Sequence, residues 1–136
     1  MRLASAVSAV VVTAALAGAA AGSASAPVPV IGNAFVGSHG FGHARPSLLS
    51  SGGGATVTVQ HLRWTHWGAK EATGLGKGWY VPDDAQAQSD GKVATEKVVA
   101  FDLGTCHGKR AYLKYIWYFP AYRKAPSRRH ANPACI

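Results

Sequence analysis

Cysteine and acidic residues are scarce in this sequence: 136 residues contain two cysteines and six acids, against 14 lysines and arginines, for a formal net charge of +8. Two cysteines are too few for a zinc site built from cysteines alone or for a small fold held by several disulfides. The length leaves room for one domain, which excludes an enzyme with separate cofactor and substrate domains. The sequence also lacks a G-x-S-x-G nucleophile elbow, an H-E-x-x-H zinc motif and a glycine-rich phosphate-binding loop. It therefore names no catalytic residue, no metal site and no cofactor.

Residues 1–26 have the features of a secretory signal peptide. Arg2 supplies a positive charge, an apolar run extends over 3–21, and the small residues that follow match a signal-peptidase site, with cleavage after Ala24 or Ala26. The run approaches the length of a membrane span, but alanine and glycine make it weakly hydrophobic, and no second apolar stretch follows. We therefore expect a secreted, extracellular protein that loses a single charge, that of Arg2, on processing.

Residues 27–54 differ in composition from the rest of the chain. Half of these positions are Gly, Pro or Ser, and the apolar residues follow neither a strand nor a helix period. Glycine gives the unfolded backbone much entropy to lose on ordering. We therefore expect a flexible leader, in which His39 and His43 are solvated side chains rather than metal ligands.

Residues 55–136 are expected to form the folded β domain. Apolar and polar residues alternate with period two in four segments: 55–64, 71–81, 92–103 and 110–119. In the first of them the apolar residues change face after Gln60, which indicates either a β-bulge or burial of both faces. No segment has an apolar helical stripe with caps. The pattern predicts an all-β fold, a small antiparallel sandwich or partly open barrel of four to five strands, centred on a hairpin over 92–119.

A row of small residues follows one face of the second segment: Ala72, Gly74, Gly76 and Gly78. Such a face offers a flat floor for large rings, and Trp64 and Trp67 are the nearest candidates in the sequence.

Residues 62–68, Leu-Arg-Trp-Thr-His-Trp-Gly, are followed by Ala-Thr-Gly-Leu-Gly at 72–76. Together they resemble the L-x-W-x-x-W-G…A-x-G-x-G motif of small secreted actinobacterial proteins of unknown function. Tyr-Ile-Trp-Tyr at 115–118 is similar to the last strand of that group, whereas this sequence lacks the group's extra cysteine pair in the segment matching 83–91. The resemblance implies a β-rich secreted module and supplies no active-site residues.

Cys106 and Cys135 have only each other as intramolecular partners. Export favours oxidation, so we expect one disulfide between them, with free thiols or an intermolecular bridge as the alternatives. Closing this loop would remove about 3–4 kcal/mol of unfolded-state entropy.

The basic residues gather near the C-terminus. Residues 109–136 contain seven bases and no acid, whereas residues 27–108 contain six of each. An extended basic segment flanked by tyrosines is typical of a protein that binds polyanions, such as nucleic acid, wall polymers or anionic lipid. We therefore predict a secreted, monomeric, non-enzymatic protein that binds an anionic polymer or the cell-envelope surface. The candidate binding residues are Lys109, Arg110, Lys114, Arg123, Lys124, Arg128 and Arg129.

Two other functions stay open at this point. A small ribonuclease-like hydrolase needs a base and a histidine acid beside a basic pocket, and the residues that could supply them are Glu71 or Glu96 with His61, His66 or His107. A protein-binding module or inhibitor would instead expose an apolar strip of Tyr112, Ile116 and Tyr118. Convergence of histidines and acids in one cleft would favour the hydrolase, and scattered positions would favour binding.

Overall fold

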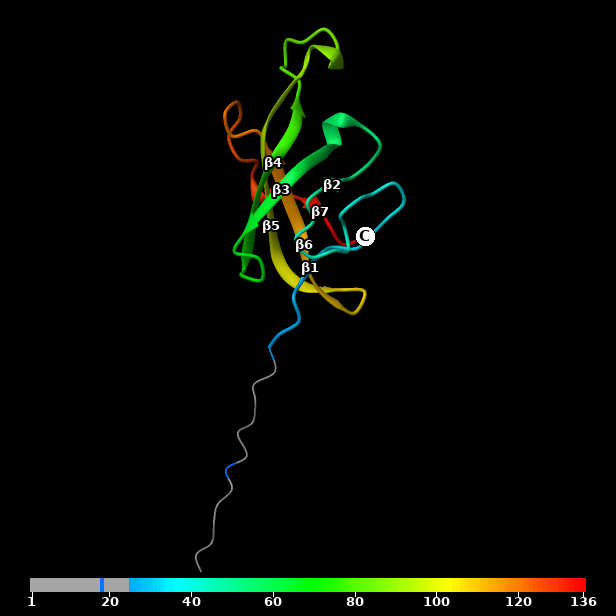
Figure 1. Cartoon of the computed structure of the whole chain (residues 1–136), viewed down its shortest axis with the longest axis vertical. Helices are drawn as coiled ribbons and strands as arrows, with labels where there is room; N and C mark the ends of the chain where they lie inside the picture. Colours follow the sequence, from blue (N-terminus) through cyan, green and yellow to red (C-terminus); the bar gives the residue numbers. More distant parts are fainter. Residues whose placement is uncertain (1–17, 19–24) are drawn as a thin grey trace, which may run out of the picture.

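The computed structural model describes Gly18 and residues 25–136 (Figure 1). The predicted signal peptide therefore lies outside the described residues, apart from Gly18, Ser25 and Ala26. The strands are β1 (Val30–Ile31), β2 (Leu49–Ser50), β3 (Thr58–Thr65), β4 (Glu71–Tyr80), β5 (Lys92–Cys106), β6 (Lys109–Tyr118) and β7 (Asn132–Pro133). Three short 3-10 helices complete the secondary structure: η1 (Ala55–Val57), η2 (Gln88–Asp90) and η3 (Arg128–His130).

The predicted all-β class is confirmed, because no α-helix occurs in the described residues. This part of the chain likewise contains no helix that is long and apolar enough to cross a membrane. The four long strands β3 to β6 correspond to the four segments whose alternating pattern predicted strands.

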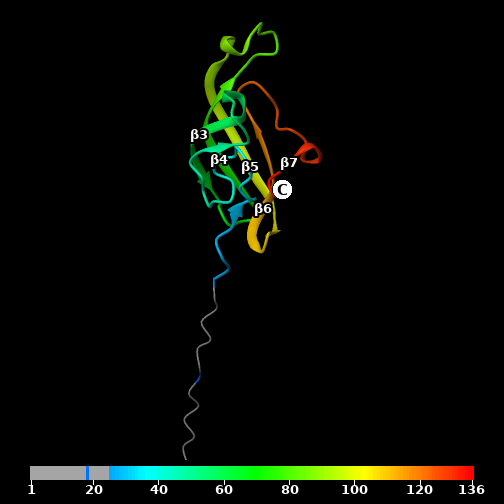
Figure 2. The same ribbon diagram turned by 90° about the vertical axis from the view of Figure 1, so that its right-hand side faces the viewer.

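All seven strands belong to one curled sheet in the order β1-β6-β5-β4-β3-β2, with β7 also paired to β6 (Figures 1 and 2). The predicted hairpin over 92–119 is its centre, since β5 pairs with β6 from Lys97–Tyr118 to Cys106–Lys109. The sheet is larger than expected because three two-residue strands extend it, and such short strands carry no periodic pattern. It is also mixed rather than purely antiparallel, because β1 runs parallel to β6.

A β-bulge in β3 explains the change of face after Gln60. The pairing of β3 with β4 shifts its register between Gln60 and Arg63, and His61 within the bulge has a φ of 55°. The extra residue lets Val59 and Leu62 both face the core. The bulge is therefore the correct one of the two alternatives that the sequence left open.

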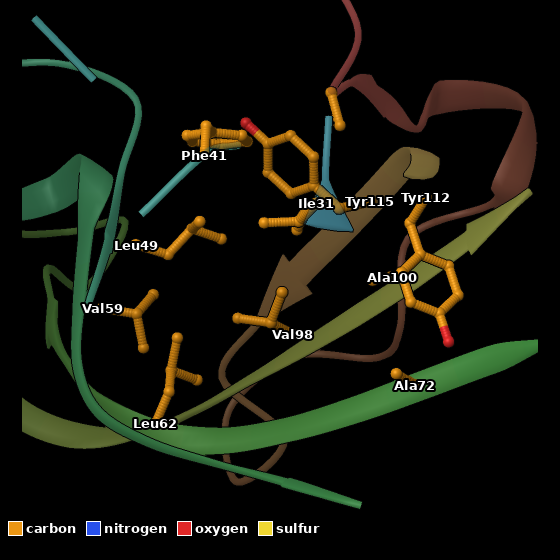
Figure 3. Close-up of a cluster of buried hydrophobic side chains, with 11 residues drawn as sticks. Ile31, Phe41, Leu49, Val59, Leu62, Ala72, Val98, Ala100, Tyr112 and Tyr115 are labelled. Atoms are coloured by element: carbon orange, nitrogen blue, oxygen red, sulfur yellow. The ribbon is translucent and has the colours of Figure 1, made fainter. Parts of the chain in front are cut away.

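The core lies on the inner side of the curled sheet (Figure 3). The small-residue row of β4 lets large side chains approach the backbone: a Cβ at Gly74 would lie 3.0 Å from the ring of Trp64. Trp67 does not lie on the glycines but packs edge-on against Trp64, with 4.7 Å between ring centroids, and against Tyr112. The fully or nearly fully buried members of the core are Ile31, Phe41, Leu49, Val59, Leu62, Ala72, Val98, Ala100, Tyr112, Tyr115 and Ala134.

The prediction of a flexible leader over 27–54 is wrong. Ile31, Phe41 and Leu49 are at most 1% exposed and belong to the core, and the indole nitrogen of Trp67 donates a hydrogen bond to the carbonyl oxygen of Pro29 at 2.8 Å. The segment contributes its core residues singly, between tight turns at glycines with positive φ, so no period appears in the sequence. Its boundary with the folded domain at residue 55 therefore does not exist in the structure.

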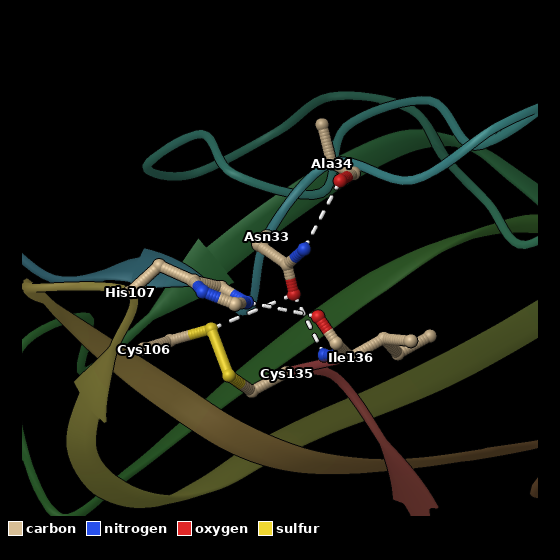
Figure 4. The surroundings of a disulfide bond; sticks show 6 residues. All are labelled: Asn33, Ala34, Cys106, His107, Cys135 and Ile136. Carbon is tan, nitrogen blue, oxygen red and sulfur yellow. Dashed lines mark hydrogen bonds between the residues drawn. A yellow bond between two sulfur atoms is a disulfide. The ribbon is translucent and has the colours of Figure 1, made fainter.

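The predicted disulfide between Cys106 and Cys135 is confirmed, with 5.7 Å between the two Cα atoms (Figure 4). Asn33 joins the N-terminal part of the chain to the same place. Its backbone N–H donates to the carbonyl oxygen of Ala134 at 3.1 Å, and its side-chain oxygen accepts from the N–H of Ile136 at 2.7 Å. Both ends of the domain are therefore fastened at the turn between β5 and β6.

Gly32 is required at this junction, which gives the first prediction. Its φ is +51°, and a Cβ there would overlap the carbonyl oxygen of Ala134. Gly32→Ala should lower the free energy of unfolding by more than about 2 kcal/mol, since strain and overlap act together. Chemical denaturation measures this loss. Gly53→Ala is the matched control, because nothing lies within 4 Å of a Cβ at that position; equal stability of the two variants would contradict the packing described here.

Candidate functional site

Three of the seven candidate basic residues make ion pairs with acids from outside the C-terminal segment. The pairs are Lys114 with Asp102 at 3.8 Å, Arg128 with Glu71 at 2.8 Å, and Arg123 with Asp83. These acids belong to β4, β5 and the connection between those strands. Although residues 109–136 contain no acid, the fold therefore places acids from other parts of the chain next to this segment.

Two of these arginines also contact aromatic rings and so fasten the C-terminal segment to the sheet. The guanidinium of Arg128 lies 4.4 Å from the ring centroid of Phe101, and that of Arg123 lies 6.0 Å from the ring of Tyr80. Tyr122 stacks on Tyr80 with 4.2 Å between the ring centroids. Tyr122, 46% exposed, thus has one ring face against Tyr80, and the ammonium of Lys92 lies 4.9 Å from its ring centroid.

The other four candidates have no carboxylate partner, and they are spread along the molecule. Lys109 and Arg110 lie beside the turn between β5 and β6, where Arg110 donates to the carbonyl oxygen of Pro27 at 2.9 Å. Lys124 and Arg129 lie in the exposed segment that follows β6. The structure thus brings the seven predicted residues into no single patch, because Lys109 begins β6 and Arg123 lies beyond the other end of this ten-residue strand.

A different group of basic residues comes together on the outer face of the sheet, the side of β3 to β6 turned away from the core. Arg63 lies opposite Leu75, which lies opposite Lys97, so the three form one row across β3, β4 and β5. Lys77 follows Leu75 by two residues on the same face of β4 and donates to the hydroxyl of Thr95 at 3.1 Å. Arg63, Lys77 and Lys97, the outer-face cluster, make no ion pair in the described part of the chain.

Sequence reasoning missed the outer-face cluster because its members belong to the part of the chain in which acids and bases balance. One signal for the cluster was present in the sequence. In β4 and β5 the alternating pattern places Lys77 and Lys97 on the face opposite to the small and apolar residues of the same strand, which predicts that both lysines face outward. What the sequence did not provide was the cross-strand register, which aligns Arg63 with Lys97.

An open groove of about 510 Å³ lies on the outer face next to Lys77. The glycine loop 52–54 and the side chains of Thr58, Gln60, Lys77 and Trp79 contribute to its lining. The indole nitrogen of Trp79 donates to the carbonyl oxygen of Gln88 at 2.8 Å. A Cβ at Gly91 would overlap this indole, so glycine there allows the ring to rest against the loop. The groove therefore combines a fixed aromatic ring, hydroxyl and amide groups, and one lysine.

The histidines and acids proposed for a hydrolase do not converge. His61, His66 and His107 occupy a bulge and two turns, and no histidine nitrogen comes within 4.0 Å of a carboxylate oxygen among the described residues. In the same part of the chain, the one group of three His, Cys, Asp or Glu side chains close enough to share a metal ion is Cys106, His107 and Cys135. Its sulfur atoms form the disulfide and are not available as thiolate ligands.

The apolar strip expected for a protein-binding module is not exposed. Tyr112 is fully buried, Ile116 is 3% exposed, and Tyr118 is half-buried. The hydroxyl of Tyr112 donates to the carbonyl oxygen of Ala69 and accepts from the N–H of Gly68. Tyr112 therefore belongs to the framework that holds the turn between β3 and β4.

Glu96 is a buried carboxyl on the inner side of β5. It is 4% exposed, and its carboxyl group occupies the space that a Cβ at Gly78 would need. Desolvation by burial raises the pKa of Glu96 from its ordinary value of 4.5 to about 7. Close to neutral pH this acid therefore contributes only part of a negative charge to the protein.

No protein-family model, no curated protein and no solved structure matches this chain. The resemblance of 62–76 to a group of small secreted actinobacterial proteins therefore stays a prediction. In this chain, the lettered residues of that motif, such as Leu62, Trp64, Ala72 and Gly74, lie at the core.

The raised pKa of Glu96 gives a prediction for the pH dependence of stability. Between pH 4.5 and 7 the unfolded chain releases this proton and the folded chain keeps it, so the free energy of unfolding falls as pH rises and is constant above that window. The loss from this one group is up to about 3 kcal/mol. Glu96→Gln should remove it, so that the stability of the variant relative to the wild type in urea denaturation rises between pH 4.5 and 7 and then levels off. Asp84→Asn is the control at an exposed acid that makes no ion pair in the described part of the chain, and an equal trend in both variants would contradict the assignment.

Proposed function

We propose that this is a secreted, monomeric, non-enzymatic protein that binds anionic polymers or the anionic cell-envelope surface. The observation that carries the proposal is the imbalance of accessible charge. Of the 14 lysines and arginines, Arg2 lies outside the described residues and three make ion pairs, which leaves ten without a carboxylate within 4.0 Å. Three of the six acids are used in those pairs, and Glu96 is buried.

Accessible bases without acidic partners favour polyanion binding for a physical reason. Each lysine or arginine that neutralises a phosphate, sulfate or carboxylate of a polymer releases a condensed counterion, and this release drives association at low salt. Within the C-terminal segment, four bases have no carboxylate partner in the described part of the chain: Lys109, Arg110, Lys124 and Arg129. The arginines paired with Asp83 and Glu71 serve to attach the segment.

Two further features support a place outside the cell. Residues 1–26 match a secretory signal, and a disulfide of this kind persists in oxidising compartments. In that setting the polyanions available are wall polymers, acidic glycans and lipid head groups. The scattered histidines and acids supply no acid–base pair for hydrolysis, so binding is preferred to the ribonuclease-like alternative.

Retention on immobilised heparin tests the proposal. The wild type should bind at low salt and elute as salt rises, and Lys124→Gln/Arg129→Gln should elute earlier, with the slope of log affinity against log salt reduced by about 2. Arg45→Gln/Lys70→Gln removes the same charge from two exposed turn positions and should change the slope less. A wild type that binds neither heparin nor anionic vesicles at low salt would overturn the proposed function.

A further inference from the structure

The outer face of the sheet has two parts, which differ in whether their basic residues form ion pairs. At one end, Lys114 and Arg128 pair with Asp102 and Glu71. The outer-face cluster of Arg63, Lys77 and Lys97 has no such partner among the described residues, although Glu71 and Asp102 lie on β4 and β5, two of the three strands that carry the cluster. The lack of acids is therefore a local property of this surface rather than a consequence of the chain's overall composition.

The three cations of the cluster lie close together. Neighbouring strands are about 4.8 Å apart, so two strand spacings place the backbones of Arg63 and Lys97 about 10 Å apart across Leu75, and Lys77 lies about 7 Å along β4. At about one Debye length in physiological salt, the three charges repel one another only weakly. Their spacing instead lets a ligand with two or three anionic groups at a similar spacing contact them together.

The groove beside the cluster indicates what else such a ligand carries. Its volume of about 510 Å³ is in the range of sites for small molecules. One wall presents the indole of Trp79, and the lining adds the hydroxyl of Thr58, the amide of Gln60 and the backbone of the glycine loop 52–54. The hydroxyl of Thr58 already donates to the carbonyl oxygen of Gly54 at 2.9 Å, so it offers a ligand only an acceptor, whereas the amide of Gln60 can both donate and accept. This combination suits a hydroxylated ring with one apolar face, which is the chemistry of a sugar.

A single-stranded nucleic acid fits the same surface less well. Proteins that bind single strands stack successive bases on a series of aromatic rings along a basic groove. Among the described residues that line this groove, Trp79 is the one Trp, Tyr or Phe, and the imidazole of His39 is the one other ring. Tyr118, at the end of the Arg63 row, is half-buried beyond Lys97. One stacking ring with hydrogen-bonding groups around it favours one sugar ring at a time.

We infer that the outer face is the recognition site for an acidic glycan, with one sugar ring in the groove against Trp79 and the anionic groups of adjacent sugars over Arg63, Lys77 and Lys97. This inference rests on the proposed function and names its ligand class and its site. Lys77 belongs to both the groove and the cluster and therefore joins the two parts of the site. The anionic group can be a carboxylate, a sulfate or a phosphate.

Short oligosaccharides test the inference, because they are too small to engage the outer face and the C-terminal segment together. The probes are a heparin tetrasaccharide, a galacturonic acid tetrasaccharide, a neutral dextran oligomer and a short oligothymidylate, each titrated by calorimetry with the full mature chain. We expect both acidic tetrasaccharides to bind more tightly than the oligothymidylate, and the neutral oligomer to bind weakly. Quenching of tryptophan fluorescence by the acidic tetrasaccharides should be lost in Trp79→Phe.

The variants separate this site from general charge attraction. Arg63→Gln/Lys97→Gln should weaken tetrasaccharide binding at least tenfold, and Arg45→Gln/Lys70→Gln, which removes the same charge elsewhere, should weaken it less than threefold. Circular dichroism of each variant checks that the fold is kept. Gln60→Ala probes the groove alone and should weaken the neutral and acidic oligomers by the same factor.

Each alternative outcome identifies what fails. Equal losses in the two double variants, or a larger loss in Lys124→Gln/Arg129→Gln than in the outer-face variant, would overturn the inference and leave the proposed function intact. Tighter binding of oligothymidylate through Arg63 and Lys97 would overturn the glycan class. A wild type that binds no tetrasaccharide but is retained on heparin would overturn the site, whereas one that binds no polyanion at all would overturn the proposed function as well.

Discussion

The pairing of the outer edge of β6 is the constraint on which the rest of the structure depends. β5 occupies one edge of β6, and the other edge is shared between β1, at Ala111 and Tyr112, and β7, at Lys114 and Tyr115. An open edge of this length would expose a row of unpaired N–H and C=O groups to other chains. Both ends of the domain cover it instead, and the Cys106–Cys135 disulfide and Asn33 hold them there. The segment 27–54 is therefore part of the fold, since without β1 part of that edge would be bare.

The covering of the β6 edge by both ends of the domain also determines which basic side chains form ion pairs and which remain accessible to a ligand. Between β6 and β7 the C-terminal segment is stretched over the sheet, and Arg123 and Arg128 reach acids of β4 and of the connection after it. These two arginines, which have no acidic neighbour in the sequence, therefore attach the C-terminal segment to the sheet. Arg63, Lys77 and Lys97 of β3, β4 and β5 face outward, whereas three of the six acids pair with bases of the C-terminal segment and a fourth, Glu96, is buried. Accessible charge is therefore more evenly distributed over the protein than its linear order indicates.

The alternating pattern was sufficient to predict the four long strands and the central hairpin, because each depends on local order. It left the bulge after Gln60 as one of two alternatives, and the disulfide was expected from the single possible intramolecular cysteine pairing rather than from the pattern. The pattern was insufficient for the N-terminal segment. Ile31, Phe41 and Leu49 enter the core singly, and a lone apolar residue between glycines has no period to detect. The ion pairs and the outer-face cluster were missed for a different reason: they depend on register between strands, such as Arg63 with Leu75 and Leu75 with Lys97.

The two faces of β4 differ in their surroundings: one packs in the core and the other carries the proposed ligand site. Ala72, Gly74, Gly76 and Gly78 turn inward, where their small size admits Trp64, Leu62 and the carboxyl of Glu96 close to the backbone. The residues between them turn outward, and Lys77 and Trp79 line the groove. The lettered positions of the L-x-W-x-x-W-G…A-x-G-x-G pattern thus pack at the core in this chain, whereas the x positions, Arg63 and Leu75 among them, lie on the outer face that we propose as the ligand site. Changes at the x positions can therefore alter this surface without disturbing the packing of the core.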